Sequence, residues 1–287
     1  MADLLQNNPS QCERDIDRFQ SGGWQRVADT LAVEEPLEIR IDHDHGGQRE
    51  TLPLTITMRT PGDDFALAAG FLFGEGILSR RADITGIDYA TDLVSEPDQQ
   101  NTVVVSLRDG LEVNLEGQRR NFAVTSACGV CGKASLAALA MDGCAPVRSG
   151  VTVSATKLTA MPAALRDAQR GFQATGGVHA AAAFRPDGTL VALGEDVGRH
   201  NAFDKLVGGQ FLAGNAEGLE ETIALLSGRA SYELLLKALR ARIPIVAAVG
   251  APSSLAAEIA QNFGITLVGF LKPGSFNVYA GRERICD

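Results

Sequence analysis

The chain has 287 residues, of which 45% are hydrophobic and 21% charged, as is typical of a folded globular protein. Its formal net charge of −9 argues against general nucleic-acid binding, because an acidic surface repels a phosphate backbone. The first residues do not show the pattern of a secretory signal, so none is expected, and the sequence has no apolar run of the roughly 18 residues expected of a membrane span. We therefore expect a cytoplasmic protein with no membrane partner and no nucleic-acid partner.

The first part of the chain predicts a small sheet with one helix. Residues 1–24 are polar and lack hydrophobic periodicity, which predicts a mobile N-terminal arm. Apolar residues alternate with others in 37–41 and in 52–58, so two half-buried strands are expected there. An apolar helix is expected over 65–73. Further strands are expected around 84–89, 102–107 and 111–115.

After residue 150 the pattern changes to alternating helices and strands. A helix is expected over 158–172, followed by a hairpin about a Pro-Asp-Gly turn. From residue 221 the order strand–helix–strand–helix–strand predicts parallel strands joined by right-handed crossovers. The expected parts of the chain are the arm (1–24), a small α+β domain (25–120), a loop with two cysteines and its following helix (121–150), and an α/β domain (151–287).

The stretch TSACGVCGK places Cys128 and Cys131 three positions apart among small residues. Five scattered cysteines do not suggest a disulfide framework. Structural zinc needs four ligands and the chain offers a single such pair, so no metal is expected. The following residues resemble the start of a helix, which would lower the pKa of a nearby thiol. The surrounding pattern is not thioredoxin-like, but disulfide exchange and sulfur carriage both stay open.

Polar residues gather at three junctions between a strand and a helix: GEDVGRHNAFDKLVG, LLSGRASYELLLKA and VGAPSSLAAEIA. Ligands of open α/β sheets bind at the carboxyl ends of strands, beside helix N-termini. These junctions therefore predict a nucleotide-sized anionic ligand, although ordinary helix capping would explain single residues. No P-loop or GxGxxG fingerprint is present, which disfavours an NTPase or a dinucleotide dehydrogenase. The site candidates here are Arg199, His200, Ser227 and Arg229.

Two further stretches stay ambiguous at this point. Lys272 lies beside a Pro-Gly turn near the C-terminus, where a plain surface turn is an equally good interpretation. His179 is flanked by small apolar residues, so a buried structural role and a site role are about equally compatible with its surroundings.

Several ordered motifs resemble the FdhD family of formate dehydrogenase accessory sulfurtransferases. Besides TSACGVCGK and the GEDVGRHNAFDKLVG junction, they are RTPGDDFALAAGFLFGEGI, GGVHAAA, SGRASYELLLKA, APSSLA, and GF followed by FNVY. The resemblance runs from about residue 35 to the C-terminus. It implies a homodimeric carrier that accepts persulfide sulfur from a cysteine desulfurase. The carrier then delivers this sulfur to the bis-molybdopterin guanine dinucleotide molybdenum cofactor, as formate dehydrogenase activity requires.

The resemblance also implies roles for particular residues. Cys128 would bear the persulfide with Cys131 assisting, and a GDP-like guanine nucleotide should bind as a fragment of the cofactor. The family commonly has arginine where this chain has Lys272, which keeps the charge but loses bidentate phosphate recognition. The implied cofactor-binding stretch is Phe270, Leu271, Lys272, Pro273, Gly274 and Ser275.

The implied fold is a small N-terminal α+β sheet domain plus a three-layer α/β domain similar to cytidine deaminases. A zinc deaminase needs an H-x-E motif and a P-C-x-x-C motif. The corresponding places read His200-Asn201-Ala202 and Ser227-Gly228-Arg229-Ala230-Ser231, so deaminase chemistry is excluded while a nucleotide-shaped pocket stays expected. Two other functions stay open, a chaperone that binds the molybdenum cofactor without carrying sulfur and a thiol–disulfide enzyme.

Overall fold

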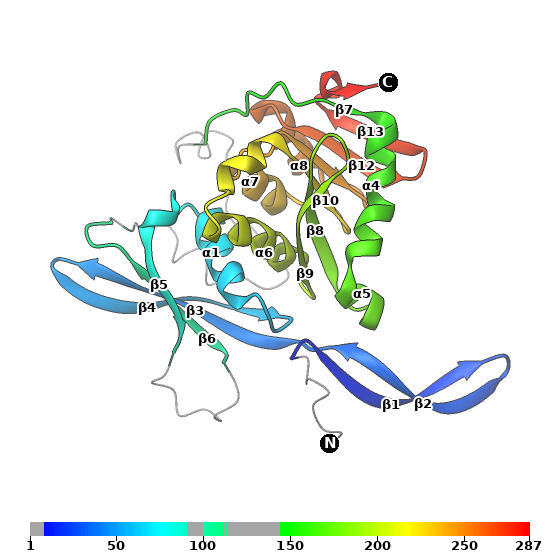
Figure 1. Cartoon of the computed structure of the whole chain (residues 1–287), viewed down its shortest axis with the longest axis horizontal. Coiled ribbons are helices and arrows are strands. Elements are labelled where there is room, and N and C mark those ends of the chain that lie inside the picture. Colours follow the sequence, from blue (N-terminus) through cyan, green and yellow to red (C-terminus); the bar gives the residue numbers. More distant parts are fainter. Residues whose placement is uncertain (1–8, 91–99, 112, 114–143) are drawn as a thin grey trace.

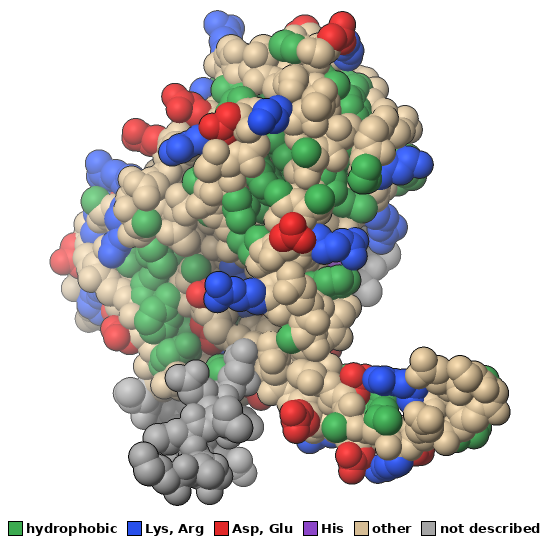
Figure 2. Space-filling view, turned by 45° about the vertical axis from the view of Figure 1, so that its right-hand side comes forward, with side chains coloured by type: hydrophobic (Ala, Val, Ile, Leu, Met, Phe, Trp, Pro, Cys, Tyr) green, Lys and Arg blue, Asp and Glu red, His purple; other side chains and the backbone are tan. Residues whose placement is uncertain are grey.

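The computed structural model describes residues 9–90, 100–111, 113 and 144–287, which form two sheet-containing domains and a projecting hairpin (Figure 1). In the hairpin, β1 (Gln11–Gln20) pairs antiparallel with β2 (Gly23–Ala32). Within the N-terminal arm expected over 1–24, residues 11–20 therefore form a strand, which the lack of hydrophobic periodicity did not predict. Most side chains of both strands are exposed, including Phe19 and Trp24. Figure 2 shows acidic and basic side chains interspersed along the hairpin.

The small domain is a four-stranded sheet in the order β4-β3-β6-β5. The strands β3 and β6 are parallel, and the other two pairs are antiparallel. The strands and the covering helix are β3 (Glu35–His45), β4 (Gln48–Arg59), α1 (Asp64–Gly74), β5 (Ile84–Tyr89) and β6 (Thr102–Leu107), with a 3-10 turn η1 (Arg81–Asp83). These strands and this helix confirm the elements expected up to residue 107. The strand expected over 111–115 falls mostly outside the described residues, as does the helix after the cysteine pair.

The large domain is a six-stranded sheet in the order β13-β12-β11-β10-β8-β9. As predicted, β10, β11 and β12 are parallel. The expected hairpin is also confirmed, and β13 adds an antiparallel edge strand. The strands of this domain are β7 (Val153–Ser154), β8 (His179–Phe184), β9 (Leu190–Asp196), β10 (Ile223–Leu226), β11 (Ile245–Ala248), β12 (Thr266–Lys272), β13 (Ser275–Ala280) and β14 (Ile285–Cys286).

Helices cover both faces of this sheet, so the domain has the three layers that were expected. Its helices are α4 (Ala155–Ala168), α5 (Arg170–Thr175), α6 (Arg199–Leu212), α7 (Tyr232–Arg240) and α8 (Ser254–Phe263), with 3-10 turns η2 (Ala216–Glu221) and η3 (Arg282–Arg284). Alternate residues of each strand face opposite layers. On β8, Ala181 packs in the cluster formed with α6, α7 and α8, whereas Ala182 packs in the cluster formed with α4. None of the described helices combines the length and the apolar character that a membrane span requires.

The helices α1 and α6 join the two domains through close backbone contact. A Cβ atom added at Gly70 would lie 1.9 Å from the carbonyl oxygen of Asp204, and one added at Gly208 would lie 1.9 Å from that of Ala66. Real atoms do not approach so closely, so only glycine permits this helix spacing. The close packing fixes the small domain against the large one.

Candidate functional site

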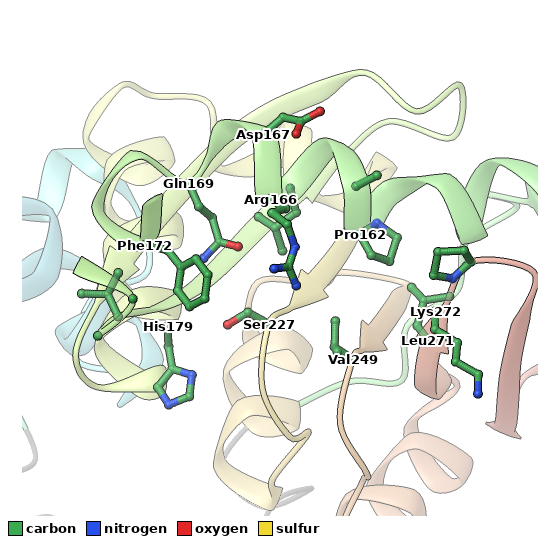
Figure 3. Close-up of a pocket in the computed structure, with 16 residues that line it drawn as sticks. Pro162, Arg166, Asp167, Gln169, Phe172, His179, Ser227, Val249, Leu271 and Lys272 are labelled. Carbon is green, nitrogen blue, oxygen red and sulfur yellow. The ribbon is translucent and has the colours of Figure 1, made fainter. Parts of the chain in front are cut away.

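A pocket lies at the carboxyl ends of the parallel strands, beneath α4 and α5 (Figure 3). Its volume is about 630 Å³, within the range of roughly 300–1,000 Å³ that is typical of small-molecule sites. The strand ends supply Ser227, Val249, Leu271, Lys272 and Pro273. The helical side supplies Pro162, Arg166, Gln169 and Phe172, among others. The sequence analysis predicted a ligand at this edge of the sheet, and the pocket lies there.

Backbone hydrogen bonds continue across the strand ends next to the pocket. The Gly250 N–H donates to the Gly228 carbonyl at 2.9 Å, and the Phe270 N–H donates to the Gly250 carbonyl at 3.0 Å. Phe270 has a φ of 52°, a left-handed conformation that is rare for a bulky residue and occurs mostly at functional sites. The pairing of β12 with β13 is irregular between Gly269 and Lys272. The Phe270 side chain is exposed, while Leu271 and Lys272 line the pocket.

The structure brings some of the predicted site residues together and separates others. Ser227, Leu271, Lys272 and Pro273 line the pocket, as does His179, whose role was left open. The Ser227 hydroxyl oxygen accepts a hydrogen bond from the Ala180 N–H at 2.8 Å, so Ser227 is also part of the sheet. The predicted residues that do not line this pocket are Arg199, His200, Arg229, Phe270, Gly274 and Ser275.

His200 lies where the N-termini of α6 and α7 meet. Its Nε2 lies 3.1 Å from both the Ser231 hydroxyl and the Glu233 carboxylate. Burial, followed by the nearby charges of Arg199 and Lys237, lowers the pKa of His200 to about 4. The ring is therefore neutral at pH 7.

We expect this histidine to make the protein less stable in mild acid. The folded-state pKa of about 4 is below the ordinary value of 6.5, so above pH 6.5 neither state is protonated. Below pH 6.5 the unfolded chain gains a proton that the folded chain gains only near pH 4. The free energy of unfolding should therefore fall by about 2 kcal/mol from this residue between pH 7 and pH 5.

Urea denaturation of wild type and His200→Gln at both pH values measures this contribution. The variant should lose less stability between pH 7 and pH 5 than wild type. His45→Gln is the matched control, since it replaces an exposed histidine of the small domain in the same way. Equal losses in wild type and His200→Gln would contradict the assignment.

The helical wall of the pocket was not singled out from the sequence. The single helix expected over 158–172 ends at Ala168, and Gln169, with φ −76° and ψ 84°, separates α4 from α5. A carboxylate from β9 stabilises this break. The Glu195 side chain accepts hydrogen bonds from the Gly171 N–H at 2.9 Å and the Phe172 N–H at 3.0 Å. No local signal marks a break whose anchor lies more than 20 residues away in the chain.

The cysteine pair lies outside the described residues, so its predicted role stays a prediction. The comparisons with known proteins bear on it instead. Residues 32–286 match the model of the FdhD/NarQ family, and this range contains Cys128 and Cys131.

Relatives of known name cover nearly the whole chain. The sulfur carrier protein FdhD of Streptomyces coelicolor is 48% identical over 275 residues, which are 95% of this chain and 94% of that protein. The sulfur carrier protein FdhD of Thermoplasma volcanium is 38% identical over 274 residues, 95% of each chain. A crystal structure described as a formate dehydrogenase accessory protein, from Desulfotalea psychrophila, has a TM-score of 0.70 at 23% identity. It covers 96% of this chain and 100% of its own, and it supports the fold.

Proposed function

The chain belongs to the FdhD/NarQ family, and on that premise we propose that it carries sulfur for formate dehydrogenase. In this proposal a cysteine desulfurase supplies persulfide sulfur, and the bis-molybdopterin guanine dinucleotide molybdenum cofactor receives it. The observation that carries the proposal is the family match over 32–286, which includes the Cys128–Cys131 pair. We further propose that the protein acts in the cytoplasm as a homodimer.

Sulfur loading requires a nucleophilic thiolate, and we assign that role to Cys128. Its sulfur attacks the outer sulfur of the desulfurase persulfide. A new S–S bond forms, the bond within the donor persulfide breaks, and the desulfurase cysteine leaves as a thiolate. The carried atom is then the terminal sulfur of a persulfide on Cys128.

Sulfur release requires two electrons if the atom is to leave as hydrosulfide, and Cys131 can supply them. Its thiolate attacks the Cys128 sulfur, and the bond to the outer sulfur breaks. Hydrosulfide leaves with the electron pair, and a Cys128–Cys131 disulfide forms. A dithiol reductant then restores both thiols before the next cycle.

The pocket beside the strand ends has features that suit the guanine nucleotide part of the proposed acceptor. A guanine nucleotide carries a flat base and negatively charged phosphates. The pocket has the volume of a small-molecule site, and its lining includes the exposed cationic side chains of Arg166 and Lys272. These features support binding of the nucleotide part of the cofactor.

The pocket alone would also serve a chaperone that holds the cofactor without carrying sulfur. A thiol–disulfide enzyme is the other alternative, and it would use the cysteine pair without a persulfide. The three functions differ in what the cysteines carry, which can be measured directly.

Mass spectrometry after incubation with a cysteine desulfurase and free cysteine tests the proposal. We expect the peptide that contains Cys128 to gain one sulfur atom and to lose it on treatment with a dithiol. A chaperone would gain no sulfur, and a thiol–disulfide enzyme would yield only a disulfide between the two cysteines. Absence of added sulfur from both cysteines would refute the carrier.

A further inference from the structure

The wall formed by the end of α4 and the start of α5 presents three kinds of side chain to the pocket. Arg166 contributes a cation, Gln169 an amide and Phe172 an aromatic ring (Figure 3). The guanidinium carbon of Arg166 lies 5.8 Å from the centroid of the Phe172 ring. Charge, hydrogen-bonding groups and a flat apolar surface therefore converge within residues 166–172.

The body of the Gln169 side chain is packed in the pocket wall, while its amide faces the open pocket. The residue is only 6% exposed, and its side chain points into the pocket (Figure 3). Its amide forms no hydrogen bond with any residue in the described ranges. The amide atoms stay accessible from the pocket that the residue lines, so they are placed to hydrogen-bond a ligand or a water molecule there.

The neighbouring Gln173 shows what an ordinary glutamine does at this turn. Its amide donates to the carbonyls of Arg166 at 2.9 Å and Asp167 at 3.1 Å, and so satisfies the end of α4. Gln169 points inward at the place where α4 ends. The Glu195 carboxylate holds the next turn through Gly171 and Phe172, which fixes the wall in this position.

We propose that Gln169 reads the edge of the guanine base of a nucleotide bound in this pocket, with Phe172 offering the base a stacking surface. This inference rests on the proposed function, which supplies the guanine nucleotide. An amide presents one donor and one acceptor side by side. Guanine presents the O6 acceptor beside the N1–H donor, so the two edges pair through two hydrogen bonds.

In this proposal the phosphates of the nucleotide are bound by two cationic side chains of the same pocket. The side chains of Arg166 and Lys272 are exposed and form no ion pair with any residue that the structure describes. They come from opposite sides, Arg166 from α4 and Lys272 from the end of β12. Burial and the charge of Arg199 lower the pKa of His179, which leaves this lining residue neutral at pH 7.

Binding of three probes to the full-length protein tests the inference, with dissociation constants measured by calorimetry. The probes are GDP, IDP (which keeps O6 and N1–H but lacks the 2-amino group) and inorganic pyrophosphate. Gln169→Leu should weaken GDP and IDP by a similar factor, roughly 10- to 100-fold for two lost hydrogen bonds, and should leave pyrophosphate unchanged. Arg166→Gln should weaken all three probes.

Two further variants separate base reading from loss of local structure. Gln173→Leu removes the same amide from the same turn but not from the pocket, so GDP affinity should change less than threefold. Gln169→Glu presents two acceptors, which match N1–H and the 2-amino group of guanine. This variant should therefore bind GDP more tightly than IDP by a larger factor than wild type does.

Several results would overturn the inference. They are the absence of GDP binding to wild type, an unchanged GDP affinity in Gln169→Leu, and an equal loss of GDP and pyrophosphate affinity in that variant. Sulfur gain on Cys128 is measured independently of these titrations. If Cys128 gains sulfur but GDP affinity does not depend on Gln169, only the proposal about the guanine base is disproved. If GDP affinity depends on Gln169 but neither cysteine gains sulfur, only the sulfur-carrier proposal is disproved.

Discussion

Sulfur transfer should be lost when Cys128 is replaced with alanine. The proposed covalent intermediate is a persulfide on this residue, and alanine offers no atom on which it can form. Formate dehydrogenase activity in cells that depend on this protein should fall by roughly a hundredfold or more, because loss of a covalent nucleophile leaves little catalysis. Activity is measured in extracts of a deletion strain complemented with wild type or variant.

Cys131→Ala should give a different loss. This variant can still accept sulfur on Cys128 but lacks the thiolate that releases it as hydrosulfide. We expect persulfide to accumulate on Cys128, seen by mass spectrometry, while formate dehydrogenase activity is low. Cys286→Ala is the control, because Cys286 is a free, exposed cysteine of the described C-terminus and its loss should leave activity unchanged. Full activity in Cys128→Ala would instead favour the chaperone.

The sequence predicted the elements whose burial leaves a periodic pattern. The residues of β5 and β6 match the expected 84–89 and 102–107, and alternate residues of β6 are buried in the core of the small domain. The hairpin of β1 and β2 escaped prediction for the opposite reason. Most of its side chains are exposed, although β2 contacts α5, so its strands carry no regular alternation of apolar and polar residues.

Only the strand-end side of the pocket could be predicted from the sequence. This side follows from the rule that ligands bind at the carboxyl ends of parallel strands, and this rule predicted Ser227 at the edge where the pocket lies. Lys272, which also lines the pocket, was expected only from the family resemblance. The helical side of the pocket depends on the break at Gln169, and that break is stabilised by Glu195 from a distant strand. Hydrophobic periodicity describes one helix or strand at a time, so it cannot reveal a hydrogen bond between two elements such as that from α5 to Glu195 on β9.

Part of the GEDVGRHNAFDKLVG junction has a structural role. Its dense polar residues predicted ligand binding, which stays a prediction for Arg199 and His200, while two of its other charged residues form a buried pair. The Lys205 ammonium lies 2.8 Å from the Asp196 carboxylate, and the two side chains are 3% and 0% exposed. The pair joins the domains, because Asp196 accepts from the Thr60 N–H at 3.1 Å and Lys205 donates to the Thr60 carbonyl at 2.7 Å.

Removing one partner of this pair should destabilise the fold strongly. Lys205→Met keeps the apolar stem but leaves the Asp196 carboxylate buried without its cation. It also leaves the Thr60 carbonyl without its donor. We expect the free energy of unfolding to fall by about 3–5 kcal/mol, as is usual when a buried ion pair loses one member. Urea denaturation at pH 7 measures the change.

The expected loss comes from burial rather than from the distance between the charges, and one exposed pair allows this to be tested. Arg242 and Glu220 are also 2.8 Å apart, but both side chains are 42% exposed. Arg242→Met should therefore cost less than about 1 kcal/mol. In the double variant Lys205→Met, Asp196→Asn no charge is stranded, so it should be more stable than Lys205→Met alone. If the Lys205 and Arg242 variants lose equal stability, the pair does not hold the domains together as the geometry indicates.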